Sequence, residues 1–401
     1  MSMGGLSQAR FDRLHAVMAG YVERGDVPGV VTLISRHGEV HVDTIGLKAL
    51  GDSAPIQRDT IFRIGSMTKP ITAAATMLLV EECKLRLDDP VDRFLPELAN
   101  RTVLKRIDGP LEDTVPAIRA ITVRDLLTLR LGLGIILAPS GSYPIQQAVN
   151  KQRIVGFGPP NVSAPHTPDE WLRRLATLPL MYQPGEKWMY NTGSAVLGVL
   201  IARASGQSLE TFLRERLFAP LGMKDTGFSV PATKLDRLVS CYQRNPTTGA
   251  LDFHDGGAES HWRHPPLFPD AGAGLVSTID DYWAFGQMLL HKGKHGKQRI
   301  LSRPAVEVMT TNQLTLEQQK SAGVVLGDNR GWGFGMSIVI QRDDVAAVPG
   351  RFGWEGSYGT SWASDPTEDM VAILLTQRLV FPQPTAIDRD FRTTAYHAID
   401  D

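Results

Sequence analysis

The stretch GSMTKPITAAATMLLVEECK, residues 65–84, decides how the rest of the chain is interpreted. From residue 71 to residue 80 it is nearly all apolar and rich in alanine, which is too long for a typical strand and predicts a buried helix. The helix is expected to begin at Ser66 or Met67, because Pro70 fits only in a first turn, where its missing N–H costs little. Cys83 is expected in the core of this helix.

Strand patterns lie on both sides of this helix, toward the two ends of the chain. β-branched or apolar runs predict strands at residues 29–35, 40–44, 61–64, 271–277, 333–341, 359–364 and 370–376. Helical spacing of apolar residues predicts helices at residues 6–23, 123–131, 168–176, 194–205, 208–217, 280–291 and 388–397. An antiparallel sheet built from both termini, with a helical insertion, explains this order better than a βαβ alternation does.

The predicted fold is therefore α/β of the α+β type, with an antiparallel sheet flanked by helices and joined to a mainly helical domain. We expect residues 1–84 and 271–401 to form a discontinuous α/β domain and residues 85–270 to form the helical one. The Gly/Pro-rich connection of residues 132–168 is expected to be a long loop that shapes a binding site. The aromatic-rich stretch of residues 253–268 is expected to shape the same pocket.

Composition excludes several classes of function. The 401 residues carry 42 basic and 43 acidic side chains, a formal net charge of -1, so no chain-wide attraction to nucleic acid or anionic lipid is expected. The N-terminus does not have the pattern of a signal peptide, and no apolar run has the length of a membrane span. We therefore expect a cytoplasmic protein without a membrane partner. Two cysteines, Cys83 and Cys241, cannot build a disulfide framework.

Ser66 and Lys69 lie three residues apart where the buried helix begins, so their side chains share one face about one turn apart. A serine hydroxyl becomes a nucleophile when a base takes its proton, and lysine is such a base only when its pKa is lowered. The N–H groups at the helix start favour negative charge there. The alternative is an N-cap serine beside a solvated lysine, because a chain of this length contains roughly one Ser-x-x-Lys by chance.

Two later segments offer partners for this serine. Tyr190 lies in GEKWMYNTGS, residues 185–194, and can relay protons if a nearby ammonium lowers the pKa of its phenol. Its alternative role is packing, with the hydroxyl on a backbone carbonyl. The segment GWEGSYGT, residues 353–360, indicates close backbone approach on an edge strand, where a free N–H can complete an oxyanion hole. The alternative there is a glycine-rich turn that leads into a strand.

The blocks GSMTK (65–69), PGEKWMY (184–190) and GWEG (353–356) occur in the order found in the class C β-lactamase and penicillin-binding-protein superfamily. Supporting stretches are LDDP (87–90), ITVRDLL (121–127), PLGM (220–223) and AGLVS (273–277). From about residue 10 to residue 380 the chain resembles these serine hydrolases, and most of all the group VIII carboxylesterases. The resemblance implies a β-lactamase/transpeptidase-like fold.

The resemblance also implies roles for individual residues. Ser66 would be the acylated nucleophile, Lys69 its general base and Tyr190 the second proton relay. The backbone N–H groups of Ser66 and Ser357 would form the oxyanion hole. The residues implied to contact substrate are Trp354, Gly356 and Asn191. No cofactor and no metal is implied.

The chain departs from lactamases and peptidases of this superfamily in two places. Their second block reads Tyr-x-Asn or Ser-x-Asn, whereas Thr192 stands at that last position here, with Asn191 beside it. Their third block carries a Lys or His before its glycine, a cation that binds the substrate carboxylate, whereas Trp354 and Glu355 stand here. A tryptophan and a carboxylate suit a neutral, apolar substrate and repel an anionic one.

The sequence therefore predicts a serine carboxylesterase that hydrolyses small, largely apolar carboxylic esters through a Ser66 acyl-enzyme, without nucleic acid and as a possible homo-oligomer. Three alternatives stay open: an acyltransferase on the same scaffold, a β-lactamase or D-Ala-D-Ala carboxypeptidase, and a noncatalytic penicillin-recognising binding module. Two further patterns have little support. In the triad Ser361, Asp365 and His397 the acid lies only four residues from the serine, and two prolines follow the pair His261 and His264.

Overall fold

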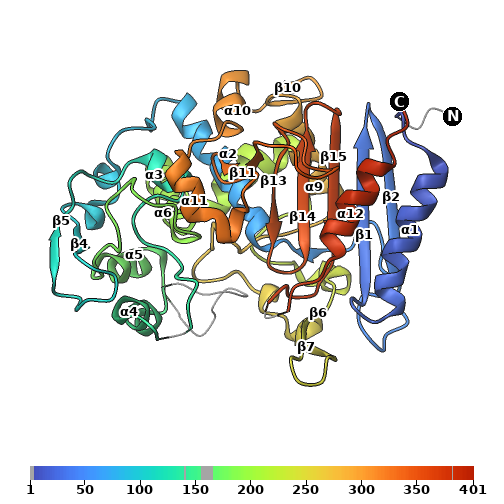
Figure 1. The fold of residues 1–401 in the computed structure, drawn as a ribbon, viewed down its shortest axis with the longest axis horizontal. Helices are drawn as coiled ribbons and strands as arrows, with labels where there is room; N and C mark the ends of the chain where they lie inside the picture. Colours follow the sequence, from blue (N-terminus) through green and yellow to red (C-terminus); the bar gives the residue numbers. More distant parts are fainter. Residues whose placement is uncertain (1–3, 140, 155–165, 382) are drawn as a thin grey trace.

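The centre of the molecule is a seven-stranded antiparallel sheet made from both ends of the chain (Figure 1). The computed structural model describes residues 4–139, 141–154, 166–381 and 383–401. The strand order is β11-β12-β13-β14-β15-β1-β2, so the first hairpin of the chain pairs with the last strand, and the predicted sheet is confirmed. Its strands are β1 (Gly29–Arg36), β2 (Glu39–Gly46), β11 (Arg330–Trp332), β12 (Ser337–Val339), β13 (Phe352–Gly356), β14 (Thr360–Asp365) and β15 (Met370–Leu375).

Helices cover both faces of this sheet. The helices α1 (Gln8–Glu23) and α12 (Ile387–His397) lie side by side on one face, where they share a core with β1 and β15 (Figure 1). On the opposite face α9 (Ile279–Leu290) packs against β1, β14 and β15. Thr278 caps α9 and accepts a hydrogen bond from the Asp281 N–H. Because both faces are covered, β1 is buried along its whole length.

The helix α2 (Thr68–Glu81) leads from the sheet into a helix-rich region, and its residues from Thr68 to Leu79 are all buried. The buried helix expected after Ser66 is therefore confirmed. It packs against α6, which is apolar along most of its length. The remaining helices are α3 (Val123–Leu127), α4 (Pro144–Gln152), α5 (Pro168–Ala176), α6 (Thr192–Ser205), α7 (Leu209–Leu213), α8 (Ala219–Leu221), α10 (Arg303–Met309) and α11 (Leu316–Leu326).

Four short strand pairs complete the described fold. They are β3 (Phe62–Arg63) with β8 (Val276–Ser277), β4 (Thr102–Leu104) with β5 (Thr114–Pro116), β6 (Cys241–Arg244) with β7 (Leu251–Asp255), and β9 (Lys294–His295) with β10 (Gln298–Arg299). Within the described ranges, no helix combines the length and the apolar character that a membrane crossing requires.

Several predicted elements have different bounds in the structure. The helix expected at residues 123–131 ends at Leu127, because Leu129 takes a left-handed backbone with φ 56°. Residues 271–273 form a turn, and only Val276 and Ser277 of the expected strand are extended. The connection at residues 132–168 contains α4, so it is not wholly a loop. Its residues 140 and 155–165 lie outside the described residues.

The prediction that Cys83 lies in the core of a helix is wrong. The helix α2 ends at Glu81, and Cys83 follows it with φ 56° and an exposed side chain. Such a left-handed residue turns the chain away from the helix axis, which points the thiol outward. Cys241 is buried, and no disulfide joins the two.

A buried ion pair holds the strand that leads to Ser66. The side chains of Arg63 and Asp255 form a salt bridge with exposed fractions of 0% and 2%. Arg63 also donates a hydrogen bond to the Val239 carbonyl at 2.7 Å, and its guanidinium lies 5.0 Å from the Trp262 ring centroid. Trp262, from the stretch expected to shape a pocket, is therefore a core residue, and residues 239–262 are tied to β3.

We expect the D255A variant to lose about 3–5 kcal/mol of free energy of unfolding, because the Arg63 charge then has no buried partner. Urea unfolding followed by tryptophan fluorescence measures this loss. The control is E259A, since the Glu259 side chain is 90% exposed, and its free energy of unfolding should change by less than about 0.5 kcal/mol. Equal stability of the two variants would contradict the role given to this ion pair.

Candidate active site

Ser66 lies in a single tight turn, Gly65–Met67, that opens directly into α2. Neighbouring side chains fix this turn: the Thr68 hydroxyl donates to the Gly65 carbonyl at 2.7 Å, and the Tyr282 hydroxyl donates to the Met67 carbonyl at 2.8 Å. Ser66 is 8% exposed. The serine hydroxyl is therefore held in a defined position, with a small opening to solvent.

Lys69 meets Ser66 as the spacing predicts. Its Nζ lies 2.9 Å from Ser66 Oγ and donates to the Gly272 carbonyl at 2.8 Å. The lysine is only 1% exposed, so its amine cannot turn into solvent. The alternative of an N-cap serine beside a solvated lysine does not hold, because the lysine is buried and no side-chain cap is formed at the start of α2.

The buried amine has the ionisation that a base requires. Burial lowers the pKa of Lys69 to about 7, while the carboxylate of Asp270 acts in the opposite direction. Above that pH most Lys69 amines are neutral and carry a lone pair. Because the Gly272 carbonyl takes one N–H, the amine is oriented with respect to Ser66 Oγ. This arrangement can accept the serine proton.

Tyr190 is the third member of the cluster. Its hydroxyl shares a hydrogen bond with Ser66, and the Trp354 indole N–H donates to it at 2.9 Å. An indole N–H is only a donor, so the phenol oxygen accepts from it, and both this hydrogen bond and the one with Ser66 act to lower the phenol pKa. Burial raises the pKa of Tyr190 well above its usual 10.0. The condition set for Tyr190, a phenol pKa lowered by a nearby ammonium, is therefore not met, because burial is the largest effect on this group.

Aromatic rings form the wall that holds Tyr190. Trp188 stacks on the Tyr190 ring with centroids 5.6 Å apart, and Trp354 lies 5.8 Å from it. Trp332 meets the Trp354 ring edge-on at 4.6 Å and closes the group. The Lys69 Nζ lies 4.6 Å from the Tyr190 ring centroid. This wall fixes the phenol beside the serine, with Trp332 fully buried and Trp188 and Trp354 only 6% and 5% exposed.

The third block brings a backbone N–H close to Ser66. A Cβ built on Gly65 would lie 3.1 Å from Ser357 N, which places that N–H beside the turn that holds the nucleophile. The strand β13 is not an edge strand, because β12 and β14 flank it. However, β12 pairs only with Phe352 and Gly353, so the end of β13 beyond them is free on that side. The N–H groups of Ser66 and Ser357 can thus face one developing oxyanion.

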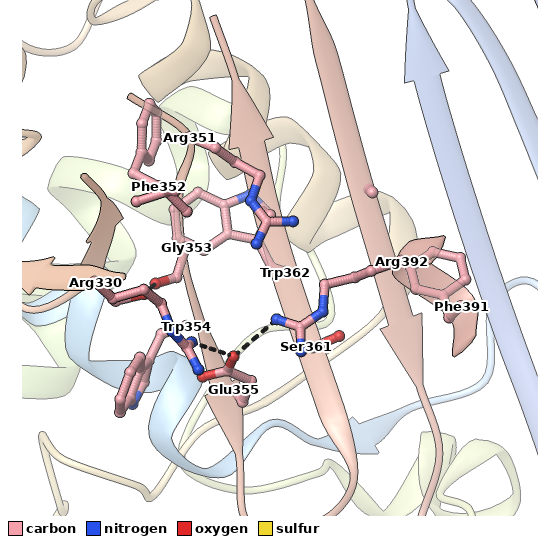
Figure 2. A pocket seen from close by; sticks show the side chains of 14 residues that line it. Arg330, Arg351, Phe352, Gly353, Trp354, Glu355, Ser361, Trp362, Phe391 and Arg392 are labelled. Atoms are coloured by element: carbon pink, nitrogen blue, oxygen red, sulfur yellow. Dashed lines mark hydrogen bonds and ion pairs between the residues drawn. The ribbon is translucent and has the colours of Figure 1, made fainter. Parts of the chain in front are cut away.

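Glu355 points away from this site. In β13 neighbouring side chains alternate between the two faces, and Trp354 takes the face of Tyr190. On the other face Glu355 accepts hydrogen bonds from Arg330 at 2.8 Å and Arg392 at 3.1 Å (Figure 2). These guanidiniums and Arg351 lower the pKa of Glu355 to about 2, although burial acts against them. The inference that this carboxylate repels anionic substrates is therefore wrong, because its charge is neutralised behind the strand.

Packing or backbone conformation constrains two of the residues that were implied to contact substrate. A Cβ on Gly356 would lie 2.3 Å from the Ile64 carbonyl, so close packing explains this glycine. Asn191 has φ 87° at the start of α6, and its Oδ1 would lie 3.1 Å from a Cβ on Gly272. Trp354 is 5% exposed. Direct contact of these three with substrate stays a prediction.

Asp270 is a site residue that sequence reasoning missed. Its carboxylate accepts a hydrogen bond from the Gly272 N–H at 2.7 Å and from the Ala273 N–H, which shapes the turn whose Gly272 carbonyl holds Lys69. Its position directly before the AGAGLVS run was the available signal, but that run was interpreted as a strand. Across the described part of the chain, no group of His, Cys, Asp or Glu that could hold a metal ion is found.

Comparison with known proteins agrees with this geometry. Residues 14–396 match the family described as Beta-lactamase. The chain is 39% identical over 363 residues to Protein Rv1367c of Mycobacterium tuberculosis, covering 88% of this chain and 87% of that protein. It is 30% identical over 396 residues to Esterase EstB of Burkholderia gladioli, covering 91% and 89%.

Among solved structures, EstCE1, described as a hydrolase with promiscuous acyltransferase activity, matches with a TM-score of 0.80 and 25% identity, covering 97% of this chain and 99% of that one. The esterase relative and this structure support a serine hydrolase. The family match over nearly the whole chain, together with the buried Ser66 and Lys69 pair, shows that this protein belongs to the Beta-lactamase family.

Proposed function

We propose that this protein is a serine carboxylesterase that hydrolyses small, largely apolar carboxylic esters through an acyl-enzyme on Ser66. The observation that carries the proposal is the pair of Ser66 and Lys69: Oγ and Nζ lie 2.9 Å apart, and burial lowers the pKa of the amine to about 7. A hydroxyl with a neutral amine in hydrogen-bond contact is an activated nucleophile.

In the first half of the reaction, Ser66 Oγ attacks the ester carbonyl carbon while the Lys69 amine takes the hydroxyl proton. The carbonyl oxygen gains negative charge and is stabilised by the Ser66 and Ser357 N–H groups. When the C–O bond to the alcohol breaks, the leaving oxygen receives the proton from the lysine by way of the Tyr190 hydroxyl. The products of this half are the free alcohol and the serine ester.

In the second half, water replaces the alcohol. Lys69, neutral again, accepts a proton from that water with Tyr190 as relay, and the hydroxide adds to the acyl carbon. The tetrahedral intermediate then breaks its bond to Ser66 Oγ, which recovers its proton from the lysine. The acid product leaves, and Ser66 and Lys69 return to their starting protonation states.

The surroundings of Ser66 support a neutral substrate. The wall nearest Tyr190 is formed by the rings of Trp188, Trp332 and Trp354. Trp354 stands where lactamases and peptidases carry a cation, and its N–H is already used by Tyr190. The Lys69 amine donates to a backbone carbonyl within the protein. These contacts favour an apolar acyl or alcohol group over a substrate that carries a carboxylate.

The test combines trapping with a substrate panel. A fluorophosphonate probe is expected to add one mass increment, located by peptide mapping on the peptide that contains Ser66. With p-nitrophenyl acetate, butyrate and octanoate, we expect turnover of the short neutral esters. Nitrocefin turnover faster than ester turnover would instead indicate a β-lactamase. Absence of both labelling and turnover in the folded protein would indicate a binding module.

An acyltransferase is the second candidate, favoured by the similarity to EstCE1, whose description includes promiscuous acyltransferase activity. The acyl-enzyme would then transfer its acyl group to an alcohol instead of water. Product analysis after addition of a primary alcohol to the ester reaction separates the two. A new ester formed in preference to the free acid would favour the transferase.

The D270N variant is expected to shift the acid limb of the kcat/KM profile to lower pH. Asparagine keeps an oxygen that can accept from the Gly272 N–H but removes the negative charge that raises the pKa of Lys69. The amine then loses its proton at lower pH and becomes a weaker base, so the plateau falls several-fold. Ester hydrolysis from pH 5 to 9 measures both effects, and this readout separates an electrostatic role from a purely structural one.

The matched control is D280N, because Asp280 lies on α9 and pairs with Arg58. Its pH profile should coincide with that of the wild type. If the acid limb of D270N stays in place, the charge of Asp270 does not act on Lys69. The role of Asp270 is then limited to shaping the turn that contains Gly272.

A further inference from the structure

A cavity lies on the face of β13 opposite the serine site. Arg351, just before β13, and Glu355 share that face, and α12 supplies Arg392 (Figure 2). A small chamber of about 20 Å³ lies among these three side chains, which is room for about one water molecule. Arg330, Arg351 and Arg392 also line a larger open cavity of about 330 Å³ next to it. That volume is at the lower end for small-molecule sites.

The charged groups around this cavity are not all joined in ion pairs. Arg330 and Arg392 share Glu355, and Arg392 also pairs with Asp388 at 2.6 Å. Arg351 is only 7% exposed, and its Nη1 is buried without a hydrogen-bond partner among the residues that the structure describes. Arg330 and Arg392 are thus each joined to a carboxylate, whereas Arg351, the least exposed of the three, has no ion pair among the described residues.

A buried guanidinium nitrogen without a hydrogen-bond partner is costly, and the Tyr396 hydroxyl and the nearby charge of Glu355 compensate only in part. Burial and the neighbouring Arg392 and Arg330 lower the pKa of Arg351, and its guanidinium lies 5.7 Å from the Tyr396 ring centroid. Across the larger cavity stand Asp343, bonded to Asn329, and Asp344. Neither is joined to Arg351 by an ion pair in the described structure.

We propose that this cavity binds a small oxyanion, a carboxylate or a phosphate, held by Arg351 and Arg392 with Arg389 at its exposed rim. The planar fork of a guanidinium matches two oxygens of such a group. A single water molecule is neutral and cannot balance the guanidinium charge. The carboxylates of Asp343 and Asp344 limit the ligand to low negative charge, since a larger polyanion would lie against them. The site is separate from Ser66, because Trp354 and Tyr190 lie on the other face of β13.

The probes are sodium phosphate and sodium acetate, each compared with sodium chloride at equal ionic strength, by titration calorimetry and thermal unfolding. We expect saturable one-to-one binding at or below about 10 mM and a Tm that rises with the anion but not with chloride. Response to phosphate alone identifies a phosphate site, and response to acetate identifies a carboxylate site. No saturable binding of either anion would overturn the proposal.

Two variants and a control make the assignment specific. R351M removes the buried charge but keeps an apolar stem, and R389M, on the exposed rim, does not disturb the core. We expect R351M to weaken binding by at least about tenfold and R389M by a smaller factor, with ester turnover unchanged in both. R86M makes the same change where the side chain is 77% exposed after α2, and should bind as wild type. Wild-type affinity in both R351M and R389M would contradict the site.

Discussion

The S66A variant is expected to lose ester turnover by at least about 10⁴-fold in kcat, while its Tm stays near that of the wild type. Ser66 Oγ is the atom proposed to form the acyl bond, and among the residues that the structure describes it is the hydroxyl in hydrogen-bond contact with Lys69 Nζ, at 2.9 Å. Since Ser66 is small and 8% exposed, its truncation leaves little empty volume. Initial rates with p-nitrophenyl butyrate, together with near-UV circular dichroism, measure activity and fold.

The matched control is S357A. Ser357 also carries a hydroxyl near the turn of Ser66, because its Oγ would lie 3.2 Å from a Cβ on Gly65. Its proposed contribution is the backbone N–H, which alanine keeps, so we expect less than about a tenfold loss. Equal losses in S66A and S357A would indicate a general disturbance of the turn, and retained turnover in S66A would exclude Ser66 as the nucleophile.

Much of the sheet could be predicted from the sequence because β1 and β15 are continuous runs of β-branched or apolar residues. β1, β14 and β15 lie close to their predicted bounds, since each is buried and paired on both sides. Elements that depend on tertiary contacts were harder to predict from the sequence. Residues 271–273 are apolar and small, as in a strand, but the Asp270 carboxylate accepts N–H bonds that hold them in a turn. The helix α11 has a capping box at Thr315 but was not predicted.

In the active site, residue types and spacing could be predicted but the electrostatic environment could not. The three-residue interval between Ser66 and Lys69 on one helix face fixes their contact, so that pair followed from local geometry. Tyr190 reaches Ser66 across more than one hundred residues, and its raised pKa depends on how completely the fold surrounds the phenol. The partners of Glu355 come from β11 and α12, which no local pattern indicates.

The K69M variant is expected to lower kcat by about 10²–10⁴-fold, because methionine fills the space of the lysine stem but cannot accept the Ser66 proton. The hydrogen bonds of Lys69 Nζ with Ser66 Oγ and with the Gly272 carbonyl are both lost. The same p-nitrophenyl ester assay measures the effect. The matched control is K187M: this lysine lies near the second block, with its Nζ 4.1 Å from the Tyr182 ring, and its loss should leave kcat near the wild-type value.

The pH dependence makes this prediction specific to the amine. The reactive form of Lys69 is neutral, so wild-type kcat/KM should rise with pH through about 7, where the folded-state pKa of the amine lies, and then level off. Because burial raises the pKa of Tyr190 above 10.0, the phenol stays protonated and no alkaline fall is expected below that pH. K69M lacks the titrating amine, so its residual activity should not show the limb near pH 7.

The two readouts together separate a base from a structural residue. A lysine that only supported the fold would, when replaced, lower kcat and leave the acid limb in place, because the titrating group would still be present. If Lys69 accepts the proton, its replacement lowers kcat and also removes the acid limb of the pH profile. If K69M keeps a limb near pH 7, another group carries the proton, and the buried amine beside Ser66 would then serve to orient the hydroxyl and hold the Gly272 carbonyl.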